Sequence, residues 1–292
     1  MERQTIEEIH IMAAELEAMT KTGLDKFSET AYNQPMKYQV KTLIEKYTGI
    51  ISQWESVECI TLNEAAHPDT LDPYFALILD VFYSGSIPPP AERAVLYGDT
   101  ISVFENSGGK DRFLSGNIPV RFEFKDTKRS EELVSIAASR LDSLYLIKDS
   151  GTYSFYRLNE GEILFSRGGW IYDLRKKLAG LGDEFWKATR DACQSKMEHF
   201  LSDLGAAFIQ NDDFFYLMSS AGFIKAACLT LLCINKRFEP SHRQYHEQVL
   251  ALPILPNSFS AQLDTFLRQD AVTTMEHKYN AAQLIARGIV VL

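Results

Sequence analysis

An apolar run with one carboxylate inside it most constrains how this chain can fold. Residues 74–83 read YFALILDVFY, and turn-forming Ser, Gly and Pro residues follow directly. Such a run predicts a strand buried on both faces of a sheet. An unpaired carboxylate at Asp80 would be costly there, so it needs a cation, a metal or strong hydrogen-bond donors beside it. The alternative is that Asp80 lies at the open end of the strand and caps a neighbouring backbone.

The composition is typical of a soluble globular protein. The 292 residues can bury a substantial core, and this length favours two domains. No window approaches the ~18–20 unbroken apolar residues of a membrane span, and the acidic start does not resemble a signal peptide. We therefore expect a cytoplasmic protein without membrane contact. The net charge of -9 argues against generic nucleic-acid binding, which depends on many Lys and Arg contacts to phosphate.

Hydrophobic periodicity predicts a change of architecture along the chain. The predicted strands cover residues 57–62, 74–83, 101–105, 119–125, 152–158 and 162–165. The predicted helices cover residues 2–21, 36–53, 91–98, 130–141 with Ser130 as N-cap, 170–179, 183–204, 211–238, 241–251, 258–269 and 275–287. We therefore expect an α+β fold. A small mixed sheet with N-terminal helices would occupy residues 1–150, and an all-α helical bundle would occupy residues 151–292.

Three carboxylates are candidates for a metal and catalytic site. Asp80 lies on one predicted strand, Glu123 lies on another, and Asp72 lies in the loop that enters the first. Carboxylates that converge at the edge of a sheet are what a Mg²⁺ site for phosphoryl or nucleotidyl transfer requires, because Mg²⁺ prefers oxygen ligands. The alternative for Glu123 is a solvated charge ladder with Arg121 and Lys125 on the same strand.

Polar residues of the helical half are candidates for nucleotide binding. Lys225, Asn235, Lys236 and Arg243 could line a phosphate-binding cleft between the domains, with a nucleotide or another small molecule as the ligand. Alternatively, Lys236 favours the C-terminus of its helix through the helix dipole, and Asn235 bonds locally to the backbone. Residues 107–110 read SGGK, which lacks the spacing of a phosphate loop and predicts a plain turn.

Three stretches carry a resemblance to a known family. They read DPYFALILDVFYSGSIP, then PVRFEFKD, then FIKAACLTLLCINKRFEPSHRQYHEQVLALPILP. Their order resembles the nucleotidyltransferase superfamily that includes kanamycin and lincosamide nucleotidyltransferases. More narrowly, the chain is similar to a bacterial branch in which a nucleotidyltransferase-like domain precedes an all-helical domain. The resemblance covers most of residues 50–270.

The resemblance implies an activity, but two of the family's motifs are changed. The family has Gly-Ser or Gly-Gly after its first strand to hold a triphosphate, where this chain has Asn63 and Glu64. The family also has two acids two residues apart on the next strand, where this chain has only Asp80. Glu123 matches the third acid of the pattern, and Asp72 or Glu64 could replace the missing one.

Two functions follow from this resemblance. In the first, the protein transfers a nucleoside monophosphate from a triphosphate to a hydroxyl of a small molecule or protein. Asp80 and Glu123 would then hold Mg²⁺, and one of them would activate the hydroxyl with Asp72. In the second, the protein is a catalytically degenerate binding or regulatory module that keeps the fold and the interdomain cleft. The pattern does not indicate an oligomeric state.

Overall fold

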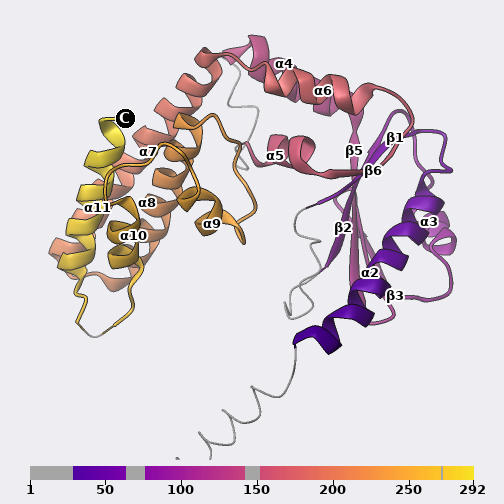
Figure 1. The fold of residues 1–292 in the computed structure, drawn as a ribbon, viewed down its shortest axis with the longest axis horizontal. Helices are drawn as coiled ribbons and strands as arrows, with labels where there is room; N and C mark the ends of the chain where they lie inside the picture. The colour runs from indigo at the N-terminus through magenta and orange to yellow at the C-terminus, as the bar shows by residue number, and fades with distance from the viewer. Residues whose placement is uncertain (1–28, 64–75, 142–151, 271) are drawn as a thin grey trace, which may run out of the picture.

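The chain has the α+β fold that the sequence predicts (Figure 1). The computed structural model describes residues 29–63, 76–141, 152–270 and 272–292, with side chains from residue 38 onward. A mixed sheet and its covering helices form one half, and helices alone form the other. The predicted helix over residues 2–21 lies outside the described residues.

Six strands form the sheet in the order β3-β4-β5-β2-β1-β6. The strands are β1 (Val57–Leu62), β2 (Leu77–Tyr83), β3 (Ile101–Ser107), β4 (Lys110–Ser115), β5 (Ile118–Asp126) and β6 (Glu162–Ser166). β2 pairs in parallel with β5, and the other neighbours are antiparallel. The apolar run around Asp80 therefore forms a central strand, β2, which is buried on both faces as predicted.

Two helices cover one face of the sheet. They are α2 (Glu29–Ile51) and α3 (Pro90–Leu96). Tyr47 of α2 and Tyr97, which directly follows α3, pack edge-to-face against Phe122 of β5, with ring centroids 5.3 and 5.1 Å away. This packing buries large aromatic surfaces and anchors both helices on the sheet.

Three helices cover part of the opposite face. They are α4 (Thr127–Ser139), α5 (Tyr153–Glu160) and α6 (Trp170–Ala179). The prediction of a strand over residues 152–158 was wrong, because this segment forms α5. The N-cap of α4 is Asp126 and not Ser130, since the Asp126 side chain accepts from the backbone N–H groups of Lys128 and Arg129. Helix α5 is the element that completes the site described below.

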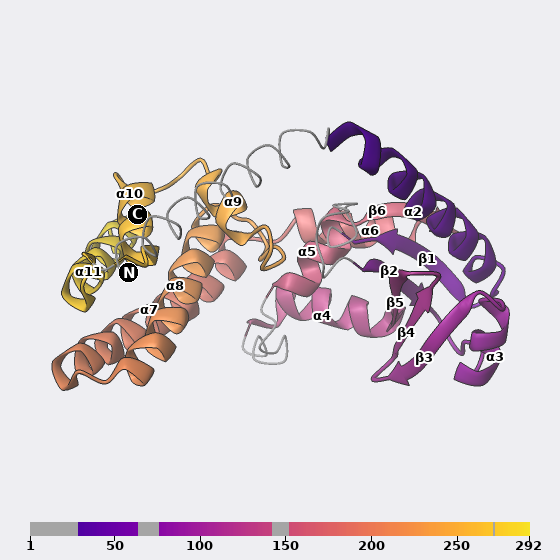
Figure 2. The same cartoon turned by 90° about the horizontal axis from the view of Figure 1, so that it is seen from below.

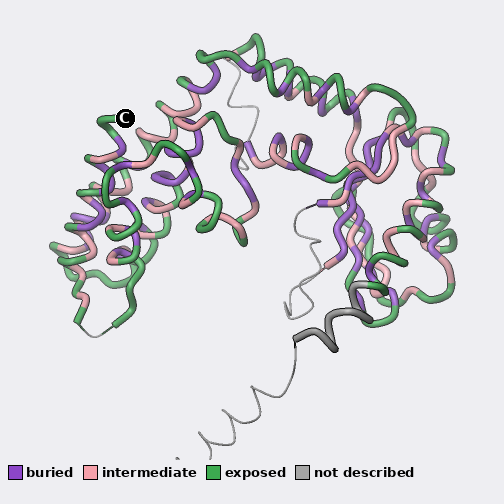
Figure 3. The backbone as a smooth tube through the Cα atoms, viewed as in Figure 1, coloured by how far each residue is buried: buried purple, intermediate pink, exposed green. Residues whose placement is uncertain are grey.

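The second half is a helical bundle that lies apart from the sheet (Figure 2). Its helices are α7 (Asp183–Gln210), α8 (Asp213–Ile234), α9 (Tyr245–Leu250), α10 (Phe259–Leu267) and α11 (Met275–Val290). The predicted boundary at residue 150 falls before β6, which pairs with β1, so the sheet half continues past it. Figure 3 shows that buried residues concentrate on the strands and on the inner sides of the bundle.

Helix α8 is the central helix of the bundle. It is the one described helix whose length and apolar composition would allow it to cross a membrane. Half of that stretch is buried inside the protein, against α7 and α11 among others. Its apolar surface is therefore accounted for in large part by the packing of the bundle.

Candidate functional site

A row of polar residues crosses four neighbouring strands. Lys110 of β4 pairs with Glu123 of β5, Glu123 pairs with Asp80 of β2, and Asp80 pairs with Thr61 of β1. Paired residues point to the same face of a sheet, so these four side chains share one face. The sequence predicted that Asp80 and Glu123 come together, and the parallel register of β2 and β5 places them side by side.

Arg157 of helix α5 binds both of these carboxylates. Its Nε and Nη2 donate to the two carboxylate oxygens of Asp80, with Nε 3.0 Å from Oδ2. Its Nη1 donates to Oε2 of Glu123 at 2.9 Å. The three side chains are at most 7% exposed. One guanidinium group therefore compensates two buried charges on adjacent strands.

Three further cations surround the pair. Lys125 Nζ lies 2.8 Å from Oδ2 of Asp80. Oε1 of Glu123 has Arg121 Nε at 3.1 Å and Lys110 Nζ at 3.3 Å. Together with the guanidinium from α5, four positive side chains face these two carboxylates, so positive charge outnumbers negative charge among the described residues of this cluster.

The protonation equilibria of the cluster reflect both burial and charge. Burial alone would raise the pKa of Glu123, but the positive charges around it, Arg157 first, hold that pKa below its usual value. Burial lowers the pKa of Lys125, and the attraction of Asp80 only partly opposes this effect. Glu123 is therefore ionised at neutral pH and belongs to the ion-pair network.

This arrangement does not fit a magnesium ion held by Asp80 and Glu123. Both oxygens of Asp80 and Oε2 of Glu123 already accept hydrogen bonds from Arg157 or Lys125. The remaining oxygen, Oε1 of Glu123, faces Arg121 and Lys110, and a dication would be repelled by these cations. Among the described residues, no group of three or more His, Cys, Asp or Glu side chains could hold a metal ion. Asp72 and Glu64, the other predicted acids, lie outside the described residues.

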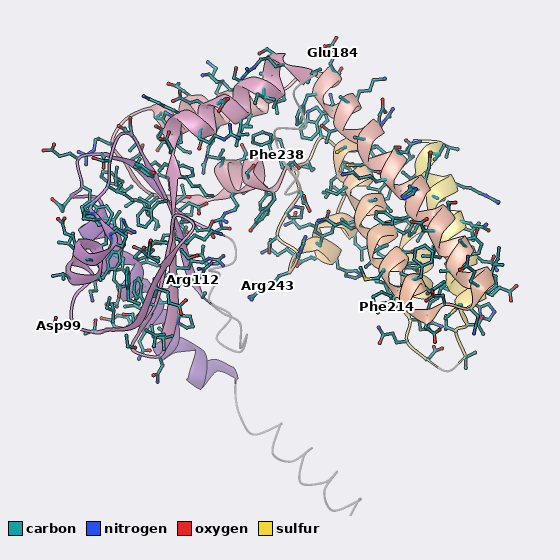
Figure 4. The ribbon with its side chains drawn as sticks, turned by 180° about the vertical axis from the view of Figure 1, so that it is seen from behind. Asp99, Arg112, Glu184, Phe214, Phe238 and Arg243 are labelled. Carbon is teal, nitrogen blue, oxygen red and sulfur yellow. The ribbon has the colours of Figure 1, made fainter. Side chains whose placement is uncertain are left out.

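A pocket of about 410 Å³ lies beside the cluster, between the sheet and the helical half. Arg121 lines it from the sheet, and Lys225, His242 and Arg243 line it from the helical half. Figure 4 shows Arg243 on the helical side, opposite the sheet, and Phe238 near the junction of the two halves. A volume of this size is typical of small-molecule sites. Basic groups on opposite walls favour an anionic ligand.

One buried carboxylate also lines this pocket. Glu239 is 3% exposed, and its Oε1 lies 3.8 Å from both Lys225 Nζ and His242 Nε2. The Tyr245 hydroxyl is 3.5 Å from the same oxygen. Burial raises the pKa of Glu239, and the charge of Lys225 partly opposes this shift. Glu239 therefore holds two basic groups at the wall of the pocket and reduces their net charge.

Two of the four predicted nucleotide-binding residues line the pocket and two do not. Lys225 and Arg243 are lining residues, as described above. The Asn235 amide instead bonds to the backbone of Ile254, donating to its carbonyl and accepting from its N–H, both at 2.9 Å. Lys236 forms a surface ion pair with Asp183 at 2.5 Å. Asn235 and Lys236 therefore have structural contacts outside the described lining of the pocket.

Sequence reasoning missed Arg157, the residue that organises the site. Its segment was interpreted as a strand, so its side chain was not placed near Asp80. One signal did point to it, because Asp80 in an apolar strand requires a compensating cation. Nothing in the spacing of the sequence shows which of the many Arg and Lys residues supplies that cation.

Comparison with known proteins gives a distant structural similarity. Neither a family model nor a curated protein sequence matches the chain. The fold is similar to the crystal structure of a nucleotidyltransferase-like protein from Exiguobacterium sibiricum. The TM-score is 0.43 and the identity is 12%, over 87% of this chain and 74% of that chain. At this level of similarity, no residue role passes from that protein to this chain.

Proposed function

We propose that this protein binds a phosphate-bearing small molecule between the sheet and the helical half, and that it does so without magnesium. In this proposal the chain is a degenerate relative of the nucleotidyltransferase-like proteins that its sequence resembles. The observation that carries the proposal is the position of Arg157, which bonds to both carboxylates that a metal would need. The protein is then a binding or regulatory module.

The charges around the pocket support an anionic ligand. The Asp80–Glu123 cluster has four cations against two carboxylates, and Arg121 belongs to both the cluster and the pocket wall. Lys225 and Arg243 approach from the opposite wall. Arg and Lys together recognise phosphate by charge-assisted hydrogen bonds, which are stronger than neutral ones.

Nucleotidyl transfer is the second candidate, and one observation favours it. Asp80 and Glu123 lie side by side on parallel strands, which is a placement that a metal-dependent transferase could use. For this activity Arg157 would have to leave both carboxylates so that Mg²⁺ could replace it. A nucleoside monophosphate would then pass from a triphosphate to a hydroxyl, with release of pyrophosphate.

A thermal-shift experiment separates the two candidates. Tripolyphosphate and the four nucleoside triphosphates would each be added to the protein in EDTA and, separately, in Mg²⁺. A ligand at about 100 times its Kd stabilises the native state by about 2.7 kcal/mol, which raises the Tm by several degrees. We expect a shift that persists in EDTA. A shift that needs Mg²⁺, together with pyrophosphate release, would instead establish the transferase.

A matched pair of variants locates the binding site. Lys225→Gln removes a cation from the pocket wall, whereas Lys236→Gln removes one outside the described lining. Both side chains are partly exposed, so both variants should fold. We expect the first to weaken anion binding and the second to leave it unchanged. Equal effects of the two substitutions would place the anion elsewhere.

A further inference from the structure

A second cavity lies directly beside the anion pocket in the helical half. It has a volume of about 300 Å³ and is lined by residues of α8, α9 and α10, and by His242. Lys225 and His242 line both cavities, so the two share a wall. A ligand bound in the anion pocket could therefore extend past these two side chains into the second cavity.

The walls of this second cavity are largely hydrocarbon. Ile224, Val249, Leu263 and Leu267 line it, and the buried thiol of Cys228 adds a further weakly polar surface. The polar groups of the described lining belong to Lys225, His242, His246 and Tyr245, and the Tyr245 hydroxyl lies 3.5 Å from Glu239. Most of the remaining wall is apolar. A nucleobase carries several donors and acceptors on its edges, and burying them unpaired is costly. The cavity therefore suits an aliphatic group better than a base.

We propose that the ligand is an amphiphilic anion, with a phosphate head in the anion pocket and an alkyl or acyl chain in the cavity between α8, α9 and α10. The inference rests on the proposed function, because the head needs the basic walls described above. It adds the chemical class of the rest of the ligand. Lys225 and His242 then lie at the junction of head and chain.

A homologous series of ligands tests this inference. Calorimetric titrations would use inorganic phosphate, then methyl, butyl and hexyl phosphate below their micelle-forming concentrations, all in EDTA. Each methylene that enters the cavity should tighten binding about fourfold, the factor that corresponds to about 0.8 kcal/mol per buried CH₂ group. Adenosine monophosphate provides the comparison with a base, and it should bind more weakly than hexyl phosphate.

Two leucine variants show whether the chain occupies this cavity. Leu267 lines the cavity and is 45% exposed, so Leu267→Gln should fold normally. Leu284 of α11 is 49% exposed and is not among the described lining residues, so Leu284→Gln is the matched control. We expect Leu267→Gln to reduce the gain per methylene and to leave the affinity for inorganic phosphate unchanged. The control should behave as the wild type does.

The outcomes separate this inference from the proposed function. If inorganic and methyl phosphate bind but longer chains bring no gain, the anion site stands and the hydrocarbon cavity does not. Tighter binding of adenosine monophosphate than of hexyl phosphate also overturns the inference. So does a gain in affinity per methylene that is the same in Leu267→Gln as in the wild type. If no member of the series binds, both the proposed function and the inference fail.

Discussion

The sheet holds a buried arginine cluster on each of its two faces, and the clusters differ in charge balance. On one face Arg93 of α3 donates to both oxygens of Asp111, each at 2.7 Å. The Tyr97 hydroxyl and the Asn106 amide donate to the same carboxylate, also at 2.7 Å. The third donor group of Arg93 bonds to the Pro88 carbonyl at 2.6 Å. This cluster has one positive and one negative charge.

The other face holds the Arg157 cluster, in which cations outnumber carboxylates. Asp80 and Glu123 are paired with four basic side chains, and one of these, Arg121, also lines a pocket. A balanced and enclosed cluster serves the fold alone, because no charge is left for a ligand. Arg157 is buried with the two carboxylates, whereas the side chains of Lys110, Arg121 and Lys125 are 37%, 33% and 24% exposed, so these three cations can also face an anion. Arg93 thus has a structural role, and the proposed function places the anion beside the cluster of Arg157.

The largest expected effect concerns the two arginines themselves. Arg93→Ala leaves Asp111 buried without its cation, and loss of one partner of a buried pair typically costs about 3–5 kcal/mol. Arg157→Ala should cost less, because Lys125, Arg121 and Lys110 remain beside the two carboxylates. Urea denaturation of both variants measures the difference. A larger loss for Arg157→Ala would contradict the idea that its cluster has cations in excess.

Asp80→Asn should lower the stability of the fold by an intermediate amount and should strengthen anion binding. The substitution weakens charge-assisted hydrogen bonds from Arg157 and Lys125, each of which is typically worth about 1.5–3 kcal/mol. Removing a negative charge beside the pocket should also strengthen anion binding. Unfolding curves and tripolyphosphate titrations measure the two effects, and weaker anion binding would contradict the account.

Asn235→Ala should have a smaller effect and none on binding. It removes the paired hydrogen bonds to the Ile254 backbone, so we expect a loss of about 1 kcal/mol in the free energy of unfolding. The affinity for tripolyphosphate should match that of the wild type, because this amide is outside the described lining of the pocket. A clear loss of affinity in the folded variant would restore Asn235 as a ligand-binding residue.

The smallest expected effect is a change in pH dependence at Glu239. Burial raises its pKa above the ordinary value of 4.5, so its ionisation costs stability as the pH rises through that raised value, and the cost is absent below 4.5. Glu239→Gln should therefore gain stability at neutral pH and lose this gain on acidification.

Protonation of Glu239 also frees Lys225 for an anion. Anion affinity should then rise more steeply on acidification in the wild type than in the variant, and parallel pH profiles would contradict this role.

The sequence predicted where the two carboxylates lie, but it did not predict which cation neutralises them. The apolar run around Asp80 and the alternation around Glu123 identified β2 and β5, and these strands bring the two carboxylates together. Hydrophobic periodicity also identified most of the helices. Arg157 could not be predicted in the same way, because its helix reaches the sheet through tertiary packing, which local patterns do not record.

The same limit explains the partial success with the pocket. Lys225 and Arg243 line the pocket. Asn235 and Lys236 lie between them in the sequence but form other contacts. Lys236 has a positive φ of 52°, just beyond the end of α8, and pairs with Asp183 on the surface. Residues that are near one another in this part of the sequence therefore do not all point toward the pocket.

The most direct test of the central claim is crystallographic. Crystals of the wild-type protein would be soaked with Mn²⁺ as a substitute for Mg²⁺, together with tripolyphosphate, and anomalous difference maps would locate any bound metal. We expect Arg157 to stay bonded to Asp80 and Glu123, with no anomalous peak between these carboxylates. Phosphate density should lie near Arg121, Lys225 and Arg243. An anomalous peak at Asp80 and Glu123, with Arg157 displaced, would contradict the central claim.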